Sequence, residues 1–257
     1  MSETPKISCI ISTYSDSDLV EKKIHEIRQQ SWFDQAEFLF VETASPERER
    51  ELIAPYTEQF SNIRLVTSDE RKTLYEAWNM GWDAASADIV CYSNMDDAMH
   101  PRLLETVVAE MDAHPDWDLC SVLIASQKSQ SPGEPDSFSP ERMKQLKIGR
   151  RPGPFSAWRK RLQGKMGQFD GRYRIIGDKD FWSRAMDPAV VVGVIPKVMY
   201  LYSIADSQLS KRENKDDELL YAKEKGVDLL WHPGVVKPML WHRRWFKWFP
   251  GRYLMDE

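Results

Sequence analysis

Two short acidic clusters are the residues in this sequence best suited to chemistry. The first, Asn94-Met95-Asp96-Asp97, directly follows the apolar run 89–92. Two adjacent carboxylates at the end of a buried strand repel each other and lose solvation unless a cation or hydrogen-bond donors compensate them. Mg²⁺ takes one or two protein carboxylates together with phosphate oxygens, so the pair fits a divalent metal bridged to a diphosphate. A turn, or a cap on the helix near Pro101, explains it equally well.

The second cluster, Gly177-Asp178-Lys179-Asp180, stands at the start of an expected helix. A carboxylate held beside a hydroxyl group can remove its proton, and such a general base contributes roughly 10²- to 10⁴-fold in rate. An Asp with an ordinary pKa of about 3.9 is already ionised at neutral pH, so Asp178 needs no special tuning for this role. The competing interpretation is a helix cap, with Asp180 stabilising the same first turn.

The elements that must position these clusters follow from the hydrophobic pattern. Short β-branched runs alternate with stretches in which apolar residues recur at helical spacing. This alternation predicts an α/β fold with a mostly parallel central sheet and helices on both faces. Ligands of such sheets bind beyond the carboxyl ends of the strands, which adds the loops Thr13–Asp16 and Glu42–Thr43 as candidate site segments. The expected strands cover residues 7–12, 38–41, 63–66, 89–92 and 119–124.

The chain is expected to form one domain over residues 1–235, with a nucleotide-binding half (1–125) and an acceptor half (126–235). The stretch from about Ser126 to Gly153 is rich in Ser, Pro, Gly, Lys and Arg, which is typical of a surface insertion or mobile loop. The run 190–202 predicts one or two strands broken at Pro196. Residues 236–257 form an aromatic and basic tail.

Composition excludes several classes of protein. The 257 residues carry 35 Lys and Arg against 40 Asp and Glu, a net charge of −5, so nucleic acid is not an expected partner. Neither a Gly-x-Gly-x-x-Gly segment after the first strand nor a Gly-Lys-Ser/Thr loop occurs, so any nucleotide must be held differently. The cysteines lie in apolar runs and suit reduced thiols of a cytoplasmic protein. No apolar run approaches the roughly 20 residues of a membrane span, and no signal peptide is expected.

Two basic segments leave alternatives open. Residues 150–165 interleave Arg and Lys with Phe155 and Trp158. They could close over a diphosphate or meet an anionic or lipid-linked acceptor, but a solvated surface is the more common explanation. In the tail, Trp241, Trp245 and Trp248 share one helical face among cations. That pattern is typical of an interfacial helix, here at the inner membrane face, and equally of a segment packed back on the domain.

Five segments occur in a characteristic order: Ile10–Tyr14, Glu37–Glu42, Ala77–Gly81, Asn94–Asp97 and Gly177–Arg184. Together they resemble the motif series of family 2 glycosyltransferases, which have the GT-A fold, and the resemblance covers about residues 6–210. It implies a Rossmann-like nucleotide-sugar transferase, usually dependent on Mn²⁺ or Mg²⁺ and inverting. The implied reaction moves a sugar, most often from a UDP-sugar, to a saccharide or lipid-linked acceptor, as in bacterial-type surface polysaccharide or glycolipid assembly.

The resemblance also implies roles for single residues, namely Thr13 and Tyr14 on the nucleotide base and ribose, Glu42 on the uracil, Asn79 in the Asn-x-Gly of the nucleotide-binding segment, Asn94 on the ribose, Asp96 on the metal and Asp178 as catalytic base. Four positions depart from the family pattern. Glu42 replaces a shorter Asp, Asn94 replaces an acid, and Gly177 stands where the family has Glu. Ser203-Ile204-Ala205-Asp206 lies where the family often has a His that helps to hold the metal or diphosphate.

Two other functions stay open at this stage. The substituted positions Asn94, Gly177 and Ala205 would suit a non-catalytic nucleotide-sugar binding or scaffold protein that kept the fold. A phosphatase or phosphotransferase with a strand-end Asp nucleophile is the third reading, and it lacks a supporting Lys and Thr context. Release of nucleotide from a nucleotide sugar, or of phosphate from an aryl phosphate, separates the three.

Overall fold

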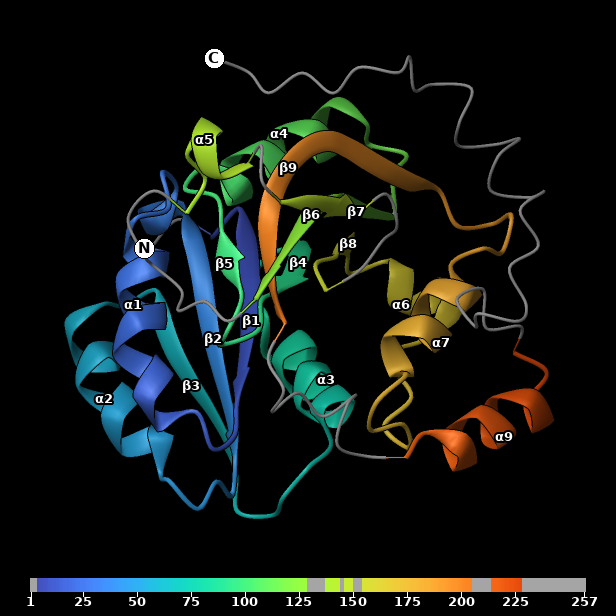
Figure 1. The fold of residues 1–257 in the computed structure, drawn as a ribbon, viewed down its shortest axis with the longest axis horizontal. Helices are drawn as coiled ribbons and strands as arrows, with labels where there is room; N and C mark the ends of the chain where they lie inside the picture. Colours follow the sequence, from blue (N-terminus) through green and yellow to red (C-terminus); the bar gives the residue numbers. More distant parts are fainter. Residues whose placement is uncertain (1–3, 129–136, 144–145, 150–153, 205–213, 228–257) are drawn as a thin grey trace.

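The fold is described from a computed structural model covering residues 4–128, 137–143, 146–149, 154–204 and 214–227. Within these residues, nine strands form one curled sheet in the order β3-β2-β1-β4-β8-β6-β9-β5, with β7 paired to β6 (Figure 1). The expected α/β architecture with helices on both faces is confirmed. The sheet has a parallel part and a mixed part, and the candidate site lies along the carboxyl ends of the parallel part.

The parallel part contains β1 (Ile7–Thr13), β2 (Ala36–Thr43), β3 (Ile63–Ser68) and β4 (Ile89–Tyr92). Apolar and β-branched residues fill both faces of β1, β2 and β4, as expected for strands covered by helices on either side. The register places Thr13 of β1 beside Glu42 of β2 and Ile10 beside Tyr92 of β4. The loops that follow these three strands therefore start at the same edge of the sheet.

The mixed part contains β5 (Ala98–Met99), β6 (Leu119–Lys128), β7 (Lys147–Gly149), β8 (Ala157–Arg159) and β9 (Val192–Ile204). Strand β8 runs antiparallel between β4 and β6, whereas β6 and β9 are parallel. Of the one or two strands predicted over 190–202, the structure has one, β9, and its pairing with β6 is interrupted at Pro196. Val122 pairs with Ile195 and Leu123 with Val198, so Pro196 lies in an irregularity of the pairing. Proline has no N–H to donate, and at this position the sheet requires no hydrogen bond from it.

The helices divide between the two faces of the sheet. Helices α1 (Val20–Arg28), α2 (Glu49–Gln59) and α4 (Leu103–Ala113) pack with Cys9 and Ile11 of β1. Helices α3 (Leu74–Ala84), α6 (Leu162–Met166) and α7 (Gly177–Arg184) pack with Ile10 on the other face. A capping box between Thr73 and Glu76 starts α3. Two further helices are α5 (Pro140–Met143) and α9 (Asp216–Glu224).

The structure changes the interpretation of the basic segment 150–165. Its described residues are built into the fold: Ala157–Arg159 is an inner strand, Arg159 pairs with Asp88, and both Arg161 and Lys165 pair with Asp118. Arg161 and Lys165 do lie at the solvated surface, but their cations also neutralise Asp118 of the domain itself.

Some expectations fall outside the described residues, among them Arg150, Arg151 and the whole tail 236–257. The three cysteines are buried and reduced, as expected. Among the residues that the structure describes, none of the helices combines the length and apolar character needed to cross a bilayer.

Candidate active site

Backbone N–H groups of the loop after β1 donate hydrogen bonds to side chains of the segment that follows β2. The N–H of Ser15 donates to Ser45 Oγ (3.1 Å), and the N–H of Asp16 donates to Glu49 Oε1 (2.8 Å). Ser15 and Ala44 have φ angles of 57° and 51°, a left-handed conformation that non-glycine residues rarely adopt. Such backbone strain persists where the surroundings over-determine it, which is frequent at binding sites.

Thr13 and Tyr14 stand at the start of the loop after β1. The Thr13 hydroxyl is buried and has no hydrogen-bond partner within the described part of the chain. An unsatisfied buried hydroxyl costs free energy, which a ligand group can recover by bonding to it. The Tyr14 ring lies against the Arg71 guanidinium, 3.6 Å from its carbon to the ring centroid. Cation and ring together form a flat surface beside the carboxyl end of β1.

Glu42 is fully buried at the end of β2. One carboxylate oxygen accepts from the N–H of Ser45 and the other from Arg50 Nε. Arg50 also donates to the Ser68 carbonyl (3.2 Å) and to Asp69 (3.1 Å). Glu42 thus already has a charged partner inside the protein, and any contact with a base uses the remaining acceptor capacity of its oxygens.

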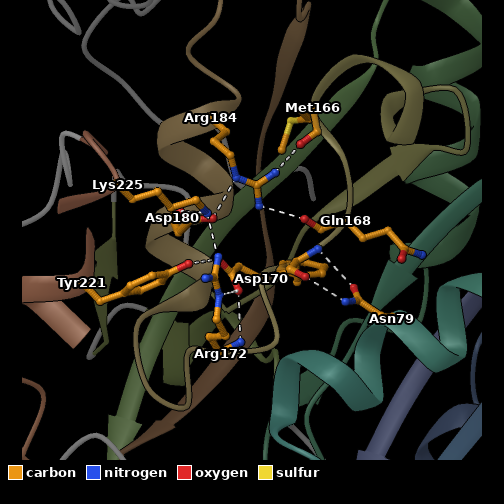
Figure 2. A network of polar contacts seen from close by, with 10 residues as sticks. Asn79, Met166, Gln168, Asp170, Arg172, Asp180, Arg184, Tyr221 and Lys225 are labelled. Atoms are coloured by element: carbon orange, nitrogen blue, oxygen red, sulfur yellow. Dashed lines mark hydrogen bonds and ion pairs between the residues drawn. The ribbon is translucent and has the colours of Figure 1, made fainter. Parts of the chain in front are cut away.

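Asn79 makes both of its side-chain hydrogen bonds within the protein. Its Nδ2 donates to the Phe169 carbonyl (2.8 Å), and its Oδ1 accepts from the Phe169 N–H (3.1 Å), as Figure 2 shows. This pairing ties α3 to the segment that leads into α7. The amide of Asn79 therefore fixes the relative position of two elements that border the site.

The buried ion pair Lys23–Glu26 of α1 supports the acidic loop Ser93–Asp97. Lys23 of α1 is fully buried and donates to Glu26 (2.7 Å), to Ser93 Oγ (3.2 Å) and to the Asp97 carbonyl (2.8 Å). Glu26 in turn accepts from the N–H of Met99 (2.8 Å). Lys23 contacts both ends of the loop, so α1 fixes the position of the loop backbone.

Asp97 is a structural residue of this loop. Its carboxylate is buried and accepts from the Ser203 N–H (2.8 Å), from Tyr200 Oη (3.0 Å) and from Asn94 Nδ2 (2.8 Å). The Ser203 hydroxyl donates to the Asp96 carbonyl. Ser203, at the position where the resemblance led us to look for a His, thus joins β9 to the acidic loop. The Asn94 amide therefore binds Asp97 within the loop, and the Asp96 carboxylate takes no part in these contacts.

Asp96 and Asp16 are partly buried carboxylates in the loops after β4 and β1. Within the described residues, neither carboxylate forms an ion pair, and that of Asp16 accepts only the weak Tyr14 N–H bond (3.3 Å). Burial raises the pKa of Asp16 to about 7, and the negative charges of Asp96 and Glu49 add to the effect. Burial also raises the pKa of Asp96, while the Lys23 charge opposes the rise. Two carboxylates that interact in this way repel each other unless a cation or hydrogen-bond donors compensate them.

Asp178 lies at the first turn of α7. Burial raises its pKa, while the Lys179 charge opposes the rise. Tyr75 of α3 directs its hydroxyl to the Ile175 carbonyl (3.0 Å) and to Asp178 Oδ1 (3.3 Å). A side chain at Gly177 would collide with the Tyr75 ring, because an added Cβ would lie 2.6 Å from two of its carbons. Glycine at this position thus lets Tyr75 reach Asp178.

Tyr92 links the base candidate to the acidic loop. Its hydroxyl is buried near the end of β4, and burial together with the charges of Asp178 and Asp97 raises its pKa. Trp78 of α3 stacks on the Tyr92 ring (3.9 Å between centroids) and lies edge-on to Tyr75 (5.3 Å). Because the Tyr75 hydroxyl contacts Asp178, these rings connect the start of α7 to the end of β4.

The donor set fits a divalent cation that completes its coordination with a ligand. In the described residues no group of three or more His, Cys, Asp or Glu side chains is arranged to hold a metal ion. Mg²⁺ and similar hard ions accept one or two carboxylates when waters and phosphate oxygens supply the rest. The partly buried Asp96 carboxylate, with Asp16 nearby, matches that requirement.

Sequence reasoning missed Asp16, Lys23, Tyr75 and Glu49 as parts of this site. Asp16 stood in a loop already singled out, and its acidic side chain after the first strand was the available signal. Lys23 and Glu49 sit on helical stretches among other charged residues, so nothing in the pattern marked them as buried. Their burial depends on which helix face meets the loops.

The comparisons with known proteins show the family and the fold. A family model described as glycosyl transferase family 2 matches residues 8–182. The chain belongs to this family. It is also similar to Glycosyltransferase AglE of Haloferax volcanii, with 25% identity over 109 residues, 42% of this chain and 36% of that protein. The chain thus spans about a third of the length of this curated relative.

Solved glycosyltransferases share the family fold. S. aureus TarS 1-349 in complex with UDP-GlcNAc aligns with a TM-score of 0.67 and 16% identity over 86% of this chain and 65% of that one. The mannosyltransferase PcManGT from Pyrobaculum calidifontis, in complex with GDP-Man and Mn²⁺, aligns with a TM-score of 0.58 and 16% identity over 82% of this chain and 59% of that one. At these identities the likeness shows a common GT-A fold.

Proposed function

We propose that this family 2 protein is a glycosyltransferase that moves a sugar from a nucleoside diphosphate sugar to a hydroxyl acceptor with inversion. The observation that carries the proposal is that Asp16 and Asp96, in the loops after β1 and β4, have no ion pair within the described residues. The proposed base Asp178 is connected to the end of β4 through the rings of Tyr75, Trp78 and Tyr92. A metal diphosphate needs negative side chains of this kind. The acceptor hydroxyl needs a base.

UDP is the proposed nucleotide. The flat surface of Tyr14 and Arg71 suits a stacked base, and the unpartnered Thr13 hydroxyl suits a polar group of the nucleotide. Glu42 would accept from the uracil and Asn94 from the ribose, as the family resemblance implied. A UDP-GlcNAc complex of TarS supports UDP, whereas the GDP-Man complex of PcManGT leaves guanine to be tested. Asn79 contributes by positioning α3 against the Phe169 segment.

Mn²⁺ or Mg²⁺ would be held by Asp96, and when bound it would stabilise the negative charge of the departing diphosphate. Asp178 would take the proton of the acceptor hydroxyl as that oxygen attacks the anomeric carbon. The carbon–oxygen bond to the diphosphate breaks on the opposite face, so the product has the inverted configuration. Tyr75 holds the Asp178 carboxylate in place for this step.

The test is incubation with UDP-GlcNAc, UDP-glucose and GDP-mannose in Mn²⁺ and in EDTA. Metal-dependent release of nucleoside diphosphate supports the transferase, with water replacing the unknown acceptor. Tight binding without release would favour a non-catalytic binding or scaffold protein instead. The proposed acceptor is a saccharide or lipid-linked sugar of surface polysaccharide or glycolipid assembly.

The proposed location is the cytoplasm, with peripheral membrane contact through the tail 236–257, which lies outside the described residues. Vesicles of anionic lipid should retain the full chain better than a chain ending at Val236. Equal retention of the two would remove this part of the proposal.

A further inference from the structure

Helix α9 (Asp216–Glu224) lies outside the segment matched by the family model, which ends at residue 182. It nevertheless packs against the segment that carries Asp178. Tyr221 Oη donates to Asp170 (2.8 Å), and Lys225 pairs with Asp170 (2.8 Å) and Asp180 (3.4 Å), as Figure 2 shows. Ala222 between them is fully buried.

Glu218 makes the contacts of α9 that lie nearest to the proposed base. Its carboxylate accepts from three consecutive backbone N–H groups, those of Arg174 (2.6 Å), Ile175 (3.1 and 3.2 Å) and Ile176 (3.0 Å). Charge-assisted bonds of this kind are stronger than bonds between neutral groups. The segment immediately before α7 is therefore held by a carboxylate from a helix about 40 residues further along the chain.

Both backbone polar groups of Ile175 are hydrogen-bonded to side chains. Its N–H donates to Glu218, and its carbonyl accepts from Tyr75 Oη, which also contacts Asp178 Oδ1. Only Ile176 and Gly177 separate this fixed peptide from Asp178. A change in the position of Ile175 would therefore move both the backbone that leads into α7 and the hydroxyl that orients the carboxylate.

We propose that Glu218 of α9 is a positioning residue for the proposed base Asp178. This inference rests on the proposed transferase function. Asp178 would touch the acceptor, whereas Glu218 acts only through the backbone of residues 174–176. Because a general base works only within hydrogen-bond reach of its proton, a small displacement costs turnover without weakening the donor site on the far side of the sugar.

The test substitution is Glu218→Gln, which keeps the size of the side chain and removes its charge. Nucleoside diphosphate release from UDP-GlcNAc, UDP-glucose or GDP-mannose in Mn²⁺ is measured at saturating donor. Glu218→Gln should lower kcat on the order of tenfold or more, with the KM for the donor and the Kd for UDP with Mn²⁺ unchanged. Hydrogen exchange at the amides of residues 174–176 should become faster.

Two variants of α9 are matched controls. Glu224→Gln makes the same change of charge at an exposed position of the helix. Tyr221→Phe loosens the docking of α9 on Asp170 and leaves the Glu218 contacts in place. Both should retain nearly wild-type kcat and the slow exchange of amides 174–176.

The outcomes separate the two proposals. If the wild-type protein releases no nucleoside diphosphate from any of the three donors, the transferase function fails and this inference fails with it. If the wild type turns over and Glu218→Gln keeps its kcat, only the positioning role is overturned. Equal losses in Glu218→Gln and Tyr221→Phe would also overturn it, because general loosening of α9 would then explain the effect.

Discussion

The carboxylates of the loops after β1 and β4 and those around α7 and α9 differ in how their charge is balanced. Asp170 and Asp180 are each paired with two cations, from Arg172, Arg184 and Lys225. Asp16 and Asp96 have no ion pair within the described residues, and the pKa of each is raised by burial. The charges of the first group are neutralised within the fold, whereas those of the second group suit the cation that we propose to bind there.

Asp178 and Asp180 show the same contrast within a single helix. They lie two residues apart on α7, but Asp180 pairs with Arg184 (2.8 Å) whereas Asp178 contacts the Tyr75 hydroxyl. A carboxylate that is neutralised by a guanidinium is a poor base, while one beside a phenol can still accept a proton. Of these two acids, Asp180 therefore serves the fold, and Asp178 is the one left available as the proposed base.

The largest expected effect is on turnover. Asp178→Asn removes the proposed base and should lower kcat about 10²- to 10⁴-fold, with the Kd for UDP and Mn²⁺ unchanged. Nucleoside diphosphate release and titration calorimetry measure the two quantities. Turnover at the wild-type rate would show that Asp178 is not the base, and the contrast within α7 would lose its meaning.

Metal-dependent binding should show the next largest effect. Asp96→Ala should weaken UDP binding in Mn²⁺ about tenfold or more, equivalent to about 1.4 kcal/mol, and should leave the weaker binding in EDTA unchanged. Asp34→Asn, a change at an exposed Asp of the same half, serves as the control. Equal affinities of wild type and Asp96→Ala in Mn²⁺ would place the metal elsewhere.

Loss of an ion-paired carboxylate should lower the stability of the protein. Asp180→Asn removes the carboxylate that neutralises Arg184, while Lys225 keeps Asp170, and should lower the free energy of unfolding by roughly 2 kcal/mol. Urea unfolding followed by circular dichroism measures this change. An unchanged midpoint would mean that these ion pairs contribute nothing, and then the two groups of carboxylates would not differ in function.

Loss of a carboxylate without an ion pair, such as Asp16, should instead raise the stability of the protein. The raised pKa of Asp16 means that its charged form is disfavoured in the folded protein, so stability is lost as pH rises from about 4 toward the folded pKa of about 7. Asp16→Asn removes this cost and should raise Tm slightly at pH 8 in EDTA, with little change at pH 4. A lower Tm at pH 8 would show that the Asp16 charge is already compensated.

A small shift in the pH profile is the last expectation. Because burial raises the pKa of Asp178, the base becomes protonated at a higher pH than an exposed Asp would. The kcat should therefore begin to fall on acidification above the ordinary range of an Asp. Rates of nucleotide release between pH 4 and 8 test this, and an acid limb at an ordinary Asp pKa would contradict the burial of the base.

Much of the N-terminal half, residues 1–125, could be predicted from the sequence because its signals are local. The buried runs of β1, β2 and β4, the helical stripe of α3 and the acidic clusters at the ends of elements all lie in contiguous residues. The edge where Thr13, Glu42 and Asp96 gather follows from parallel pairing alone. The mixed half was less predictable, because the inner strand β8 has only three residues and lies inside a basic segment.

Composition and order of motifs thus determined the fold class, the family and the candidate acids, since each is written in short stretches of chain. Tertiary structure decided which acids are free. Lys23 holds the acidic loop from 70 residues away, and Tyr75 reaches Asp178 across 103 positions. Charge compensation depends on distance in space, and sequence spacing does not report that distance for residues on different elements.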